Sequence, residues 1–303
     1  MFIELRSKMW YWLKKKIKVH SWNSFKVNIR RKIEKNIYRK KYSTEDIISL
    51  MKSMGLKKGS TVFVHSSWDE FYNYTGTIIE FIDAMLAEIG PEGTLAMPAY
   101  PLLTKANSVF KIKSTPTAAG WIAEEFRNYP NVKRSVDRHS VCAVGPNSDY
   151  LLAEHQYSIT CWDEKSPYYK LGEINALIFS FGLGKYFPGT SWHCAKSILK
   201  DEIPFFNQFF QKRVKMQIEL EDGNRYIKES LEPNDTLRLY NSPHAILKIQ
   251  KKYFDKSKYK QTKISNLSVN VHDANYLIHK VIELGRKGIV QYKPTPSKNL
   301  FNL

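Results

Sequence analysis

The chain has 303 residues, 43% hydrophobic side chains and a formal net charge of +18. This length and hydrophobic content exclude wholesale disorder and allow one large α/β domain or two small ones. The three cysteines lack CxxC spacing, which excludes a disulfide framework and predicts a reducing, cytoplasmic setting. No apolar run is long enough to span a membrane.

Positive charge is concentrated at the N-terminal end of the chain. Fourteen Lys and Arg residues against two Glu residues give residues 1–41 a net charge of +12, and aromatic and aliphatic residues interleave with them. This pattern predicts an interfacial helix that lies on an anionic membrane. We therefore expect a peripheral membrane protein at the inner face of the membrane. The alternative is a helical extension packed on the body. Nucleic-acid binding through this segment is disfavoured, because no recognised nucleic-acid motif occurs.

The predicted helices and strands alternate along the chain from residue 43. They are a capped helix over 43–54, a strand over 61–64, a helix over 78–89, a strand over 94–98, a surface loop over 100–117, a helix over 118–128, a strand over 141–146, a short helix over 147–154 and a strand over 177–184. Residues 214–229 predict an antiparallel hairpin around Asp222-Gly223, and 273–284 a helix.

This order of elements predicts an α/β fold. We expect a mixed central sheet flanked by helices, with an antiparallel hairpin insertion in the C-terminal half. The predicted organisation is an N-terminal extension over 1–41, a single domain over 42–290 and a tail over 291–303.

His193 is the first candidate for a catalytic residue. It follows the strand over 177–184 and a loop at 188–191, and lies just inside a predicted helix. α/β folds place their chemistry at such junctions of strand, loop and helix. Imidazole is also the commonest general base near neutral pH.

Seven short motifs follow one another in an order, and with gaps, that match one family. They are Val64-His65-Ser66-Ser67, the run 93–98, the run 115–120, Arg134-Ser135, the run 139–146, Ser166-Pro167-Tyr168, and Thr190 with His193. On these motifs the chain resembles the aminoglycoside 3-N-acetyltransferase family, closely over about 43–200 and loosely over 210–290. The resemblance does not cover 1–41.

The resemblance implies direct acyl transfer, in a ternary complex, from acetyl-CoA or another acyl-CoA to an amino group on a sugar. His193 is the implied general base, with Ser67 and Asp163 as further catalytic candidates. The implied CoA-binding residues are His65, Ser66, Ser67, Thr117, Gly120, Arg134, Ser135 and His139. No metal site is expected, because no His/Cys/Asp cluster has ligand spacing.

The chain departs from the family pattern in two places. Lys196 stands where the family has a Glu three residues after the histidine, so another carboxylate is needed to support an imidazolium at His193. Asp163, Glu164 and Asp137 are the candidates. The segment between Arg134-Ser135 and His139 is also about one residue shorter than in the family.

The acceptor follows from charge. An aminoglycoside is a polycation that requires an acidic site, whereas this chain is basic. We therefore expect a nucleotide-linked amino-deoxysugar for surface polysaccharide, with an aminoglycoside, and hence antibiotic resistance, as the alternative. A Cys nucleophile with ping-pong kinetics is a further alternative: Cys194 adjoins His193, but neighbouring helical residues point about 100° apart. The sequence leaves the acyl group and the oligomeric state open.

Overall fold

The structure is a computed structural model that describes residues 22–103, 109–185, 187–208, 210, 212–233, 241–292 and 298–301. The chain divides after Lys41 into two units. Predictions for residues 1–21 lie outside the described residues. In the first unit, helix α2 (Trp22–Ile37) carries Ile29, Ile33 and Ile37 as exposed side chains.

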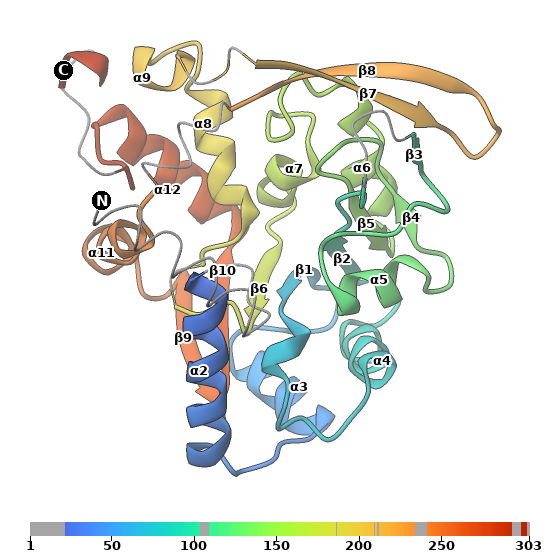
Figure 1. Cartoon of the computed structure of the whole chain (residues 1–303), viewed down its shortest axis with the longest axis vertical. Coiled ribbons are helices and arrows are strands. Elements are labelled where there is room, and N and C mark those ends of the chain that lie inside the picture. Colours follow the sequence, from blue (N-terminus) through green and yellow to red (C-terminus); the bar gives the residue numbers. More distant parts are fainter. Residues whose placement is uncertain are drawn as a thin grey trace, which may run out of the picture. The chain divides into compact units, whose positions relative to one another are not determined.

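The second unit is built on a mixed seven-stranded sheet, and the predicted fold class is confirmed (Figure 1). The strand order is β4 (Lys133–Arg134), β5 (Val141–Val144), β2 (Thr94–Pro98), β1 (Thr61–Ser66), β6 (Leu177–Phe181), β10 (Leu267–Asp273) and β9 (Tyr259–Ile264). Strand β1 pairs in parallel with β2 and β6, and the remaining pairs are antiparallel. The C-terminal ends of three parallel strands therefore meet at one edge of the sheet.

Helices cover both faces of this sheet (Figure 1). One face packs against α3 (Thr44–Ser53), α4 (Ile78–Ile89) and α5 (Trp121–Arg127). The other packs against α7 (Pro167–Glu173), α8 (Cys194–Ile198) and α12 (Ala274–Arg286). The remaining helices are α6 (Ser148–Leu152), η2 (His155–Tyr157), α9 (Pro204–Asn207), α11 (Pro243–Tyr253) and η4 (Lys298–Phe301).

Strand β1 shows why its central residues, Val62-Phe63-Val64, are all apolar. Side chains alternate across a strand, so Val62 and Val64 enter the core under α3 and α4, while Phe63 enters the core under α7 and α12. A parallel strand covered on both faces needs apolar residues at every position. The same alternation puts His65 on the side of Phe63, with the two ring centroids 4.8 Å apart.

The predicted helix starts are confirmed where a cap is present. Ser43 and Thr77 each accept the backbone N–H three residues later, and each forms a capping box with Asp46 or Glu80. These reciprocal bonds satisfy two donors that a helix start otherwise leaves free.

Several predicted boundaries differ from the structure. The strand over 177–184 ends at Phe181, because Gly182 adopts a φ of 73° where a side chain would meet Glu70. The loop over 100–117 contains β3 (Phe110–Lys111), which pairs in parallel with β7 (Lys212–Glu219) and makes the predicted hairpin of β7 and β8 (Arg225–Glu232) a three-stranded sheet. The predicted tail over 291–303 contributes Tyr292 and Phe301 to the core, so these two residues belong to the body.

Within the described part of the chain, no helix is both long and apolar enough to cross a bilayer.

Candidate active site

A cavity of about 460 Å³ lies where β1, β2 and β6 end. His65 and Ser66 end β1, Pro98 ends β2, and the loop after β6 leads to η3 (Thr190–His193). The cavity is lined by His65, Ser66, Pro98, Tyr100, Ala119, His139, Trp162, Leu183, Phe187, Thr190, His193, Lys196, Glu232, Pro233, Asn241 and Tyr292. Open α/β sheets bind ligands at the carboxyl ends of their strands, so this is the expected place for a substrate.

His193 reaches the cavity from the end of η3, where it is also the N-cap of α8. The loop that leads into η3 depends on Gly189, whose φ is 100°. A Cβ added at this position would lie 2.9 Å from Ile178. A residue with a side chain is strained at this φ. The imidazole lies 5.2 Å from the ring of Trp162. The sequence therefore predicted correctly that His193 sits at a junction of strand, loop and helix.

His65 lines the same cavity but holds the backbone before His193. Its Nε2 accepts the backbone N–H of Thr190 at 3.2 Å, and its ring packs edge-on against Phe63 and Phe187. Burial lowers its pKa to about 3, so the ring stays neutral at physiological pH. His65 therefore positions η3, and its expected contact with CoA stays a prediction.

His139 is the third imidazole of the cavity. Its ring lies between Tyr100 and Trp162, with centroid distances of 5.1 Å and 4.7 Å. Burial lowers its pKa to about 4, and the nearby carboxylate of Asp137 only partly opposes that shift. Both His65 and His139 are therefore weak bases, which leaves His193 as the candidate to accept a proton from an amine.

Arg134 and Ser135 do not line the cavity, and their contact with CoA stays a prediction. The guanidinium of Arg134 donates to the carbonyls of Ala99, Ile112 and Thr115, and lies over the ring of Phe110. Its Nε donates to the hydroxyl of Ser140. The donors that would hold a phosphate are already used, so Arg134 ties the segment around β3 to the sheet.

A buried ionic cluster lies beside this arginine. Lys228 of β8 comes within 3.3 Å of Asp137 and donates to the carbonyls of Gln156 and Ser158. His155 lies 3.6 Å from Asp137 and shares a 2.8 Å hydrogen bond with the hydroxyl of Ser135. Asp137 is fully buried in these ion pairs. Its carboxylate therefore stabilises the attachment of the β7–β8 hairpin and does not stabilise an imidazolium at His193.

The four other predicted CoA-binding residues, Ser66, Ser67, Thr117 and Gly120, divide into two groups. Ser66 lines the cavity, and Gly120 approaches the Ser66 carbonyl closely enough that an added Cβ would lie 3.9 Å from it. Ser67 instead donates its backbone N–H to Phe181, and Thr117 donates its hydroxyl to the carbonyl of Tyr100. Of the four, Ser66 is the one that lines the cavity.

A family model for aminoglycoside 3-N-acetyltransferases matches residues 63–284. The chain belongs to this family. It is 29% identical over 176 residues to the SPbeta prophage-derived aminoglycoside N(3')-acetyltransferase-like protein YokD of Bacillus subtilis, and 26% identical over 157 residues to aminoglycoside N(3)-acetyltransferase IV of a Salmonella species. These matches cover 50% and 51% of this chain, and it spans 62% and 59% of the relatives' own lengths.

Solved structures of aminoglycoside acetyltransferases share the fold. The apoenzyme AAC(3)-IVa superposes with a TM-score of 0.66 at 20% identity, covering 84% of this chain and 92% of that one. AAC-IIIb in a binary complex with CoASH superposes with a TM-score of 0.68 at 18% identity, covering 84% and 99%.

In this member of the acetyltransferase family, Lys196 lines the cavity in place of the expected carboxylate. Its ammonium lies over the ring of Trp162, 5.2 Å from the centroid. The expected catalytic Asp163 does not line the cavity, because its carboxylate accepts the backbone N–H groups of Ile159, Thr160 and Lys165. Asp163 therefore stabilises its own turn.

The carboxylate that does line the cavity is Glu232, which the sequence reasoning missed. It ends β8 and comes within 2.8 Å of Arg138 Nε. The sequence indicated the hairpin strand that carries Glu232. Only the tertiary structure shows that the end of β8 lies at the cavity.

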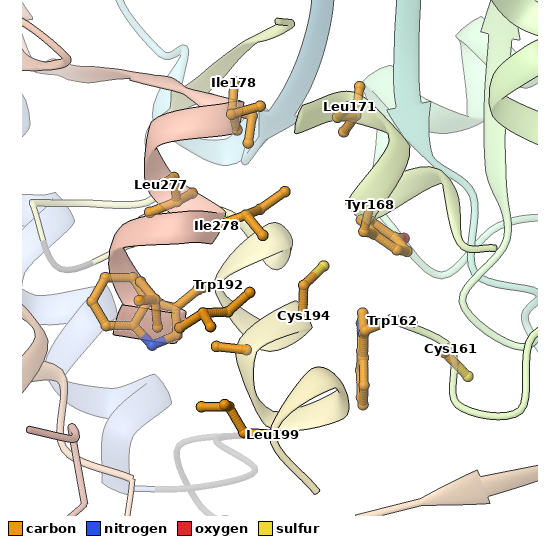
Figure 2. Packing of buried hydrophobic residues seen from close by; sticks show 14 of the residues in the cluster. Cys161, Trp162, Tyr168, Leu171, Ile178, Trp192, Cys194, Leu199, Leu277 and Ile278 are labelled. Carbon is orange, nitrogen blue, oxygen red and sulfur yellow. The ribbon is translucent and has the colours of Figure 1, made fainter. Parts of the chain in front are cut away.

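The cysteines do not support the ping-pong alternative. Cys194 lies in the core, where Figure 2 shows it pointing toward Tyr168 and Trp162, and burial raises the pKa of its thiol well above the ordinary value. Burial likewise raises the pKa of Cys142 to about 12. A thiolate is the reactive form of cysteine, so both side chains act as small core residues.

Proposed function

We propose that this protein transfers an acetyl group from acetyl-CoA to an amino group of an aminoglycoside, with His193 as the general base. The family match supports this reaction class. The observation that carries the assignment of the base is the set of three imidazoles on one cavity, two of which have a pKa of about 3 or 4. Their low proton affinity leaves His193 for the task.

In the proposed reaction, the neutral amine of the acceptor attacks the thioester carbonyl, and His193 takes a proton from the attacking nitrogen. The carbonyl π bond opens to an oxyanion and a C–N bond forms. The oxyanion then collapses, the C–S bond breaks, and the proton passes from His193 to the departing sulfur of CoA. Ser66 and Tyr100 line the cavity, and we propose their hydroxyls as the donors to the oxyanion.

Replacing the base tests this mechanism. His193→Ala should lower kcat by about 10²- to 10⁴-fold, the usual range for loss of a general base. His279→Ala is the matched control, because His279 lies on α12 outside the cavity. Turnover of the His193 variant near that of the unmodified protein, with an unchanged melting temperature, would rule out His193 as the base.

A second acceptor is favoured by one observation. Lys196 lies on the cavity wall, so the wall carries a cation as well as the carboxylate of Glu232. Such a wall attracts a polycationic aminoglycoside less strongly than it attracts an amino sugar joined to an anionic nucleotide diphosphate. The nucleotide-linked amino-deoxysugar is therefore the second candidate.

Charge reversal separates the two acceptors. Initial rates of CoA release are measured with gentamicin, with apramycin and with a nucleotide-linked 4-amino-4,6-dideoxysugar. Lys196→Glu should raise kcat/KM for an aminoglycoside and lower it for the nucleotide sugar, whereas Lys248→Glu on the exposed face of α11 should change neither. Turnover of the nucleotide sugar alone would overturn the aminoglycoside proposal.

We also propose that α2 contacts an anionic membrane surface. Ile29, Ile33 and Ile37 recur every four residues and are 43%, 53% and 67% exposed, which gives one apolar stripe. Lys32 and Arg30 flank this stripe on the helix. Apolar insertion beside basic residues is typical of interfacial helices.

Co-sedimentation of the full chain with vesicles tests the membrane contact. Phosphatidylserine-containing vesicles should bind the chain, and replacing all three isoleucines by serine should reduce binding severalfold. Ile79→Ser, at another exposed isoleucine, should leave it unchanged. Equal recovery with pure phosphatidylcholine vesicles would contradict the proposal.

A further inference from the structure

Three side chains from separate segments converge beside the cavity. His139 precedes β5, Cys161 lies between η2 and α7, and Glu232 ends β8. One ligand-type atom of each lies within 4.8 Å of those of the other two. The proposed acyl transfer gives the buried Cys161 no role.

We propose that His139, Cys161 and Glu232 form a binding site for a transition-metal dication of the Zn²⁺ class. Imidazole nitrogen, thiolate sulfur and carboxylate oxygen are the ligand set that zinc takes in proteins. His139 and Glu232 also line the cavity, which places the proposed site at the cavity wall. Three protein ligands with one open position are typical of zinc sites that meet substrate or water.

An unsatisfied atom supports the site independently of this convergence. Nδ1 of His139 is buried and meets no hydrogen-bond partner among the described residues. A buried polar atom without a partner costs about 1–3 kcal/mol, and a metal ion would remove that cost. Burial keeps the His139 ring neutral, which is the form that ligates a metal.

Charge balance is also met. Binding breaks the S–H bond of Cys161, forms a sulfur–metal bond and releases the proton to solvent. The resulting thiolate and the carboxylate of Glu232 neutralise the two positive charges of the ion. Glu232 has two oxygens, so one is left for the ion while Oε1 stays 2.8 Å from Arg138 Nε.

Asp137 supports the arrangement from behind. Its Oδ1 accepts the backbone N–H of His139 at 2.8 Å. Such outer contacts orient metal ligands and are typical of metal sites. Zinc bonds of about 2.0–2.3 Å place ligand atoms roughly 3.5 Å apart, so the three side chains need to move inward by about an ångström.

Cobalt titration of the full chain, without a polyhistidine tag and after removal of metal with a chelator, tests the site. Co²⁺ reports a thiolate ligand through a charge-transfer band in the near ultraviolet, and Zn²⁺ competes for the same position. We expect one equivalent of Co²⁺ to bind and give this band. Cys161→Ser should abolish the band and weaken binding by about tenfold or more.

Matched variants separate this site from adventitious binding. Cys142→Ser removes another buried thiol, outside the cluster, and should keep both the band and the affinity. If Cys161→Ser fails to fold, Glu232→Gln provides the second reading, with affinity expected to fall by about tenfold or more. Absence of binding by the unmodified chain, or unchanged binding by either cluster variant, overturns the proposal. Neither readout depends on acetyl transfer.

Discussion

Two segments at the cavity end of the sheet carry motif residues of the same kind, but they use them differently. In 189–196, the polar groups of His193 and Lys196 reach the cavity, and His65 supports them through Thr190. In 134–138, Arg134, Ser135 and Asp137 bind other protein groups and do not line the cavity. A motif residue is therefore accessible to a substrate only where the fold places it on the cavity wall.

Breaking the buried ionic cluster should give the largest loss of stability. Asp137→Ala leaves the buried ammonium of Lys228 without its counter-charge, and such a change costs about 3–5 kcal/mol. Urea unfolding measures the loss. The double variant Asp137→Ala with Lys228→Met should recover part of it. A loss below about 1 kcal/mol would mean that the 134–140 segment is not the structural partner of the hairpin.

Two neighbours in β4 provide the next test. Arg134→Met removes the donor to the carbonyls of Ala99 and Thr115 and should lower the free energy of unfolding by about 2–4 kcal/mol. Lys133→Met breaks only an exposed ion pair with Asp149 and should cost less than about 1 kcal/mol. If Arg134 contacts CoA instead, its variant would raise the KM for acetyl-CoA with little change in unfolding.

Lowering the pH should reduce the free energy of unfolding by a smaller amount, through the imidazole of His65. Burial holds the pKa of His65 near 3, against about 6.5 in an unfolded chain, so below pH 6.5 the unfolded state binds more protons. The stability contributed by the neutral ring is complete above pH 6.5 and falls by about 1.4 kcal/mol per pH unit toward pH 3.

Urea unfolding at pH 7 and pH 5 measures this effect. The unmodified chain should lose about 2 kcal/mol more than His65→Gln over this interval, because glutamine does not titrate. His279→Gln, at an exposed imidazole, should behave like the unmodified chain. Equal losses in all three proteins would show that His65 is not held neutral by the fold.

Most of the fold was predictable from local pattern. The capping boxes at Ser43 and Thr77 and the short apolar strands each depend on residues close together in sequence. The second sheet was only half predicted, since the β7–β8 hairpin has its own turn signal but β3 joins it from a polar loop. Two strand residues are too few to leave a periodic pattern.

The sequence by itself determined the α/β class, the family and the place of His193, because strand, turn and helix signals lie next to one another there. The tertiary structure alone decided which polar residues line the cavity. Arg134 is taken up by carbonyls of Ala99, Ile112 and Thr115, and Glu232 arrives from a hairpin far along the chain. The physical reason is that satisfaction of a donor or acceptor depends on atoms brought together by folding, and spacing along the chain does not encode those distances.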